Sequence, residues 1–142
     1  MSPFEYVYNK VFTRLEPSKI QGIGLFAVRD IPKGEFIFEK WNGPSGKYNL
    51  TQKELDRLPK LLKAHILSSF LYNNNYPYDS DIVIELYNNC HWIYTTPYYF
   101  VNSSHNFNID KDTLLTTRNI KEGEEILSNY KRLEKISDKD MI

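Results

Sequence analysis

Short apolar runs recur along the chain, at lengths typical of β-strands. Within these runs, apolar residues alternate with polar ones or cluster, and β-branched and aromatic residues are frequent. Turn signals that contain glycine or proline lie between them. The pattern predicts a mostly β domain, with strands at residues 11–15, 24–28, 35–39, 82–86, 114–117 and 125–130.

One stretch, at about residues 51–72, follows a helical pattern instead. Thr51 and Glu54 have the spacing of a capping box, in which two side chains satisfy backbone donors at a helix start. Because Pro59 lacks a backbone N–H, we expect a short helix before it and a longer helix beginning near it. Residues 73–80 hold many turn formers and are expected to form an exposed loop.

The chain also contains an internal repeat. Residues 29–37, Arg-Asp-Ile-Pro-Lys-Gly-Glu-Phe-Ile, recur as residues 118–126, Arg-Asn-Ile-Lys-Glu-Gly-Glu-Glu-Ile. Both copies predict a strand, a turn with glycine in the left-handed conformation, and a second strand. Two copies are too few for a solenoid, so they indicate two similar β-turn-β units within one compact fold.

Length and charge limit the classes of function. A chain of 142 residues with 41% hydrophobic content predicts one core and a single domain, 1–142. Eighteen basic and eighteen acidic side chains cancel, which disfavours direct binding to nucleic acid or to a membrane surface. No apolar run approaches the roughly 20 residues of a membrane span, and no signal peptide is recognisable.

Cysteine and histidine usage argues against a metal site and a disulfide. Cys90 is the only cysteine, and the Cys90-His91 pair has no further ligands nearby in the sequence. We therefore expect no metal, and a soluble, intracellular protein of the cytoplasm or nucleus of its host or source cell.

Three motifs stand out: Gln21-Gly22-Ile23-Gly24-Leu25-Phe26-Ala27, the segment 100–108 (Phe-Val-Asn-Ser-Ser-His-Asn-Phe-Asn) and the segment 123–130 (Gly-Glu-Glu-Ile-Leu-Ser-Asn-Tyr). In this order they resemble the glycine-any-glycine opening, the central asparagine motif and the closing glycine-glutamate-glutamate strand of the SET-domain family. The resemblance spans residues 19–130.

The resemblance implies a β-clip fold of several small sheets with a short helical insert, followed by a tail at 131–142. In that fold the C-terminal segment is threaded under a loop in a knot-like arrangement, a rare exception to ordinary chain topology. The threading would bring the second and third motifs together, so that residues far apart in the sequence share one site.

The same resemblance implies S-adenosyl-L-methionine as cofactor and methyl transfer to a lysine side chain of a protein, for which a basic histone tail is one example. Tyr130 would be the catalytic residue, beside the transferring methyl group. The implied cofactor-binding residues are Gln21, Gly22, Ile23, Asn102, Ser103 and Tyr130.

Several positions depart from the family pattern. Ser103 stands where the family has histidine, and Phe107 where it has proline. Ser128 replaces a phenylalanine or tyrosine and would leave more room for a methylated amine. Ile82 would align with a second channel tyrosine, for which Tyr98 is one of several substitutes.

Simpler interpretations of the same residues remain open. Tyr130 could only pack at a strand end, Asn102 could cap a turn, and Gly22 could serve a tight turn without a ligand. At the level of the whole chain, the alternative to an enzyme is a catalytically impaired SET fold that acts as a cofactor- or protein-binding module. A cysteine-rich zinc segment present in many relatives is absent, so the tail or a second subunit of a homodimer would close the substrate channel.

Overall fold

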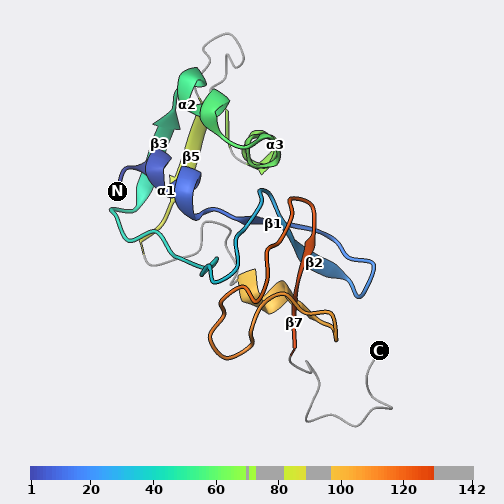
Figure 1. The fold of residues 1–142 in the computed structure, drawn as a ribbon. Helices are drawn as coiled ribbons and strands as arrows, with labels where there is room; N and C mark the ends of the chain where they lie inside the picture. The colour runs from blue at the N-terminus through green and yellow to red at the C-terminus, as the bar shows by residue number, and fades with distance from the viewer. Residues whose placement is uncertain (70, 73–81, 89–96, 130–142) are drawn as a thin grey trace.

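The structure is mostly β, as the sequence predicts. It is a computed structural model that describes residues 1–69, 71–72, 82–88 and 97–129. Strands arranged in two small sheets dominate it, and the helices are few and short (Figure 1). The expected exposed loop at 73–80 and the tail at 131–142 lie outside the described residues.

The first sheet collects strands from the beginning, middle and end of the chain. Its order is β1 (Thr13–Pro17), β2 (Ile23–Ala27), β7 (Glu125–Ser128) and β6 (Asn102–Ser103). β2 is antiparallel to both β1 and β7, whereas β6 runs parallel to β7. All three sequence motifs therefore meet on neighbouring strands.

The second sheet lies with the helices at the other end of the molecule (Figure 1). Its order is β3 (Gly46–Leu50), β5 (Ile82–Leu86) and β4 (Leu71–Tyr72). The predicted strand at 82–86 is thus confirmed. β3 was not predicted, although polar and apolar residues alternate in it, because it contains only two apolar residues, Tyr48 and Leu50, and directly follows a Gly-Pro-Ser turn signal.

Two helices follow β3, as the sequence predicts. α2 (Gln52–Arg57) begins at the Thr51 capping box, whose two reciprocal hydrogen bonds are both present. α3 (Lys60–Ser69) begins directly after Pro59, so the proline separates a short helix from a longer one.

A further helix, α1 (Pro3–Lys10), was not predicted. The Ser2 hydroxyl accepts a hydrogen bond from the Glu5 backbone N–H at 3.1 Å, and Pro3 occupies a first-turn position where its missing N–H costs nothing. Phe4 and Val7 are buried on one face. The Ser2-to-Glu5 spacing is a helix-start signal from which this helix could have been predicted.

The buried side chains form two clusters rather than the single core expected from chain length. The first packs α1, α2 and α3 against the second sheet, with Leu50, Leu55, Leu62 and Ile82 fully buried. The second lies around the first sheet and includes Leu25, Ile109 and Ile126. Each small sheet buries one face, so each sheet needs its own set of side chains packed against that face.

The two clusters meet where β1 and β2 leave the first sheet. Val11 and Val28 belong to the helical cluster, while their chain neighbours Phe12 and Ala27 belong to the other. The backbone N–H of Val28 donates to Phe12 O at 2.8 Å. Arg29 extends the junction, since its guanidinium donates to the carbonyl oxygens of Val7 and Tyr8 at the end of α1.

The two repeated β-turn-β units pair with each other. Ile31 and Ile120, which occupy the same place in the two copies, exchange reciprocal backbone hydrogen bonds of 2.8 Å. Gly34 and Gly123 both adopt the left-handed conformation predicted for them, with φ of 87° and 86°. The two units therefore share one backbone geometry.

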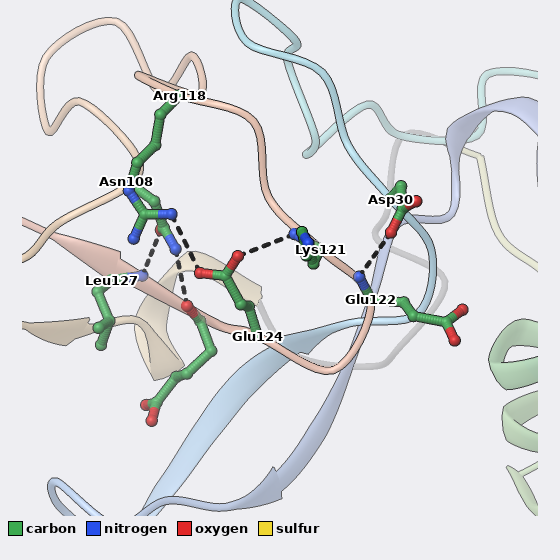
Figure 2. A network of polar contacts seen from close by, with 8 residues as sticks. Asp30, Asn108, Arg118, Lys121, Glu122, Glu124 and Leu127 are labelled. Atoms are coloured by element: carbon green, nitrogen blue, oxygen red, sulfur yellow. Dashed lines mark hydrogen bonds and ion pairs between the residues drawn. The ribbon is translucent and has the colours of Figure 1, made fainter.

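Each unit also stabilises the turn of the other. The Asn119 side-chain oxygen accepts from the Lys33 N–H at 2.9 Å, and the Asp30 carboxylate accepts from the Glu122 N–H at 2.9 Å. Figure 2 shows the Asp30 carboxylate directed at the backbone nitrogen of Glu122 in the second turn. Since Asp30 and Asn119 are matching positions, the two contacts are equivalent and reciprocal.

The outer segments of the units are less regular than predicted. Residues 35–39 and 114–117 form isolated bridges, such as Phe36 with Leu115, instead of full strands. Leu114 has a φ of 61°, in the left-handed region that non-glycine residues rarely adopt. The bridge between Phe36 and Leu115 follows directly after this turn and is not extended into a ladder.

The segment from Asn102 to Ile109 contacts both edges of β7. Backbone groups of adjacent strand residues point to opposite edges. Ser128 O accepts from Ser104 N at 2.9 Å on one edge, whereas Leu127 O accepts from the N–H groups of Asn108 and Ile109 on the other. The intervening residues must therefore cross β7, as the threaded arrangement implied by the family resemblance requires.

Asn108 holds this crossing in place. It is fully buried, and its Nδ2 donates to Glu125 O at 2.8 Å. Its Oδ1 accepts from Leu127 N at 2.8 Å, a contact visible in Figure 2. The side-chain amide thus replaces a strand neighbour and satisfies β7 backbone groups that would otherwise be buried without partners.

Within the part of the chain that the structure describes, no helix has the length and apolarity to cross a membrane.

Candidate functional site

The first motif forms the loop between β1 and β2. The backbone N–H of Ser18 donates to Gly22 O at 2.8 Å and closes the loop. Gly22 has a φ of 51°, in the left-handed region that favours glycine. Ile20 and Ile23 are exposed on either side, which leaves the backbone of Gln21 and Gly22 at the surface of the first sheet.

Asn102 connects this loop to the two later motifs. Its side chain is only 2% exposed, and it lies on β6 beside β7. Asn102 Nδ2 donates to Gln21 O at 3.1 Å and to Glu125 Oε2 at 2.9 Å. The structure thus brings together Gln21, Gly22 and Asn102, three of the predicted cofactor-binding residues.

Glu125 is a member of the site that sequence reasoning missed. Both of its carboxylate oxygens lie 2.8 Å from Ser18 Oγ, and one of them also accepts from Asn102. Gly24 makes room for this carboxylate, because a Cβ built on Gly24 would come within 2.3 Å of Glu125 Oε2. A glycine in regular strand conformation, opposite a strand that begins with glutamate, is the signal that could have indicated it.

Ser103 presents its backbone rather than its side chain. Its neighbour Ser104 donates from N–H to Ser128 O on β7. Because adjacent strand residues point their backbone groups to opposite edges, the N–H and C=O of Ser103 point away from β7, toward the outer edge of the sheet. Loss of the family histidine at this position leaves that backbone orientation intact.

The closing strand is described as far as Asn129, so the predicted catalytic residue Tyr130 lies outside the described residues. Ser128, two positions earlier, is fully buried, and the Tyr98 hydroxyl lies 3.3 Å from its Oγ. The Tyr98 hydroxyl therefore reaches Ser128, and the greater room that a serine would leave for a methylated amine stays a prediction. Tyr98 in turn packs edge-on against Phe38, with ring centroids 5.8 Å apart.

Other candidate residues do not join this site. Ile82 is fully buried in the helical cluster, not beside β7. His65 lies buried on α3, where burial and, to a smaller extent, the positive charge of Arg14 lower its pKa to about 4, so it is neutral at pH 7. His105 is an exposed residue of the crossing segment, as expected for a turn position, and Cys90-His91 lies outside the described residues.

The arrangement suits a small polar ligand with an amino-acid end. The Asn102 amide nitrogen donates to the Gln21 carbonyl oxygen, so Asn102 Oδ1 faces away from it, and the backbone groups of Ser103 face the outer edge of the sheet. The geometry provides hydrogen-bond acceptors for an ammonium group beside an edge that can pair with a heterocyclic base. The residues present therefore fit the methionine and adenine parts of S-adenosylmethionine.

Comparison with known proteins identifies a family. A family model described as the SET domain matches residues 22–131, which is most of the chain. A search of curated proteins found no match.

The solved structures that match this chain are distant in sequence. A Plasmodium falciparum protein described as a candidate histone methyltransferase is 17% identical, with a TM-score of 0.36, and the alignment covers 87% of this chain and 96% of that one. A chain of apo ctPRC2, with two substitutions in Ezh2, is 22% identical, with a TM-score of 0.42; the alignment covers 89% of this chain but only 16% of that longer chain.

Proposed function

The chain belongs to the SET-domain family, and from this premise we propose that it is a protein-lysine N-methyltransferase that uses S-adenosyl-L-methionine. The observation that carries the proposal is the meeting of all three motifs at the Asn102 side chain, which bonds to Gln21 on one side and Glu125 on the other. The substrate would be a lysine of another protein, and a basic tail such as that of a histone is one candidate.

The proposed cofactor contacts are those that the family resemblance implies, and the geometry of the described residues supports them. The backbone at Gln21, Gly22 and Ile23 would hold the methionine part, and Asn102 would hold its amino group. The edge-facing backbone of Ser103 would bind adenine. Bound there, the cofactor supplies an electrophilic methyl group on a positively charged sulfur.

The chain's own contribution to the reaction is positioning and desolvation. Holding an attacking amine in line with a methyl group can contribute roughly 7–11 kcal/mol. A lysine must also lose its proton, at a cost of roughly 4–5 kcal/mol at pH 7 from its reference pKa of about 10.4. An apolar, aromatic surrounding lowers this cost because it disfavours the charged ammonium, so no dedicated general base is required.

Tyr130 is the proposed catalytic residue, since it follows the buried end of β7 by two positions and carries a hydroxyl on a rigid ring. Tyr130→Phe removes that oxygen and keeps the apolar ring. We expect turnover to fall about 10²-fold or more, roughly 2.7 kcal/mol of transition-state stabilisation, while cofactor affinity changes far less. Equal turnover in the two proteins would remove Tyr130 from the catalytic site.

The proposal as a whole is tested by cofactor binding and then by methyl transfer. S-adenosylmethionine or its demethylated product should raise the melting temperature, because a ligand that binds only the native state stabilises it. Gly22→Trp should abolish the shift. Tritium transfer from labelled cofactor to a panel of proteins that includes histones then measures activity, and absence of any shift at millimolar ligand would refute the cofactor assignment.

A second candidate function is a binding module that keeps the fold without turnover. The observation that favours it is the contact of the Tyr98 hydroxyl with the buried Ser128, at a position where the family resemblance expects phenylalanine or tyrosine. A module of this kind would show the thermal shift and no tritium transfer to any protein of the panel.

A further inference from the structure

The Glu125 carboxylate occupies an enclosed position at the start of β7. It lies against the backbone of Gly24, where any side chain larger than hydrogen would displace it. Ser18 Oγ donates to the carboxylate and in turn accepts from the backbone N–H of Ile20 at 3.0 Å. Glu125 therefore anchors the loop that carries Gln21 and Gly22.

The contacts of Asn102 determine which way its amide faces. The two partners of Nδ2 are a carbonyl oxygen of Gln21 and a carboxylate oxygen of Glu125, and both can only accept hydrogen bonds. The nitrogen of the amide must therefore face them, and Oδ1 must face the other way. Among the described residues no hydrogen bond engages Asn102 Oδ1, so the group that binds there has to be a donor.

The charge at this place also favours a particular ligand. The ion pairs between described residues involve Glu16, Glu39, Asp56 and Glu124, and none involves Glu125. Since none of the described cations pairs with it, the half-buried Glu125 carboxylate should attract a positive group more strongly than a carboxylate in open water does. A donor with positive charge, such as a primary ammonium, meets both requirements.

We propose that Glu125 is a positioning residue that orients the Asn102 amide, and that its charge selects for the ammonium group of the cofactor's amino-acid end. The proposal rests on the proposed function, which it deepens by assigning a role to Glu125, Ser18 and Gly24. Gly24 is required in this scheme for the approach of the carboxylate, whereas Gly22 is required for its positive φ.

The test compares two ligands by isothermal titration calorimetry. S-adenosylhomocysteine carries the ammonium and no sulfonium charge, and its desamino analogue lacks the ammonium. Glu125→Gln keeps the size of the side chain and removes its charge. We expect this change to weaken S-adenosylhomocysteine about tenfold or more and the desamino analogue less than about twofold.

Two further variants make the test specific. Gly24→Ala keeps the Glu125 charge but displaces the carboxylate, and it should produce the same selective loss. Partial unfolding of a variant divides both affinities by the same factor, so the ratio of the two dissociation constants is unaffected by it. The control is Glu124→Gln, because the adjacent Glu124 pairs with Arg118 at 3.1 Å and should leave the ratio unchanged.

Each outcome decides a different question. Equal weakening of both ligands by Glu125→Gln would make Glu125 a purely structural residue and overturn this inference, while the proposed function would stand. Equal binding of both ligands by the unaltered protein would overturn recognition of the ammonium. Failure of the unaltered protein to bind either ligand at millimolar concentration would overturn the proposed function itself, and the role of Glu125 with it.

Discussion

Phe36 and Glu125 occupy the same place in the two β-turn-β units, and they serve opposite purposes. Phe36 is 41% exposed on the surface and packs edge-on against Phe38. Glu125 turns inward and bonds to Ser18 and Asn102. The shared backbone therefore does not create the site, which arises where the second copy departs from the first.

The arginines that open the two copies differ in the same way. Arg29 reaches out of its unit to the carbonyl groups at the end of α1 and lies over the Phe12 ring at 5.2 Å. Arg118 stays within its own unit and pairs with Glu124 on the surface, as Figure 2 shows. The first copy joins the fold to its helical cluster, and the second copy faces the candidate site.

The largest effect should come from Asn108, a contact that the second copy has and the first lacks. When the repeat alignment is extended toward the N-terminus, Lys19 is the counterpart of Asn108, and it is exposed. Asn108→Ala leaves the Leu127 N–H and Glu125 C=O buried without partners, at about 1–3 kcal/mol each. We expect a loss of about 2–4 kcal/mol in the free energy of unfolding, measured by urea denaturation.

Lys19→Ala is the matched control and should change stability by less than about 0.5 kcal/mol. Asn108→Asp retains the acceptor for Leu127 N–H and loses only the donor to Glu125 O, so its loss should be intermediate. Equal stability of the Asn108 and Lys19 variants would show that β7 does not depend on the side-chain amide.

A smaller effect tests the symmetry itself, at Gly34 and Gly123. Their φ angles agree within a degree, and nothing lies within 4 Å of a Cβ added to either. Substitution by alanine therefore adds only conformational strain, about 1–2 kcal/mol at each position. The two variants should lower the melting temperature equally. If the two variants differed by more than about 1 kcal/mol in the free energy of unfolding, one turn would be able to relax around the alanine and the other would not.

Local signals in the sequence predicted much of the fold. The Thr51 capping box and Pro59 placed two helices, and the repeat predicted two turns with left-handed glycines. The helix at Pro3–Lys10 was not predicted although Ser2 and Glu5 signal its start, because it is short and its buried face holds few apolar residues. Helix starts and turn conformations of this kind depend on neighbours within a few residues in the sequence.

Features that depend on distant contacts could not be predicted in the same way. The role of Glu125 depends on Gly24 and Asn102, which reach it only through the strand order of the first sheet. The hydroxyl contact of Ser128 depends on Tyr98, thirty positions earlier in the chain. The division into two clusters likewise depends on how the helices cover the second sheet.

The smallest effect concerns the reciprocal caps of Asp30 and Asn119, each of which stabilises the turn of the other unit. Asp30→Ala and Asn119→Ala each remove one partly exposed hydrogen bond to a backbone N–H, so each should cost about 1 kcal/mol. Asp30→Asn and Asn119→Asp keep an acceptor oxygen and should leave the free energy of unfolding nearly unchanged. Because the two caps act on different turns, the double alanine variant should lose the sum of the two single losses, within about 0.5 kcal/mol by urea denaturation. A larger departure from additivity would mean that the turns communicate through the Ile31 and Ile120 pair between them, and the two units would then be one cooperative element rather than two similar ones.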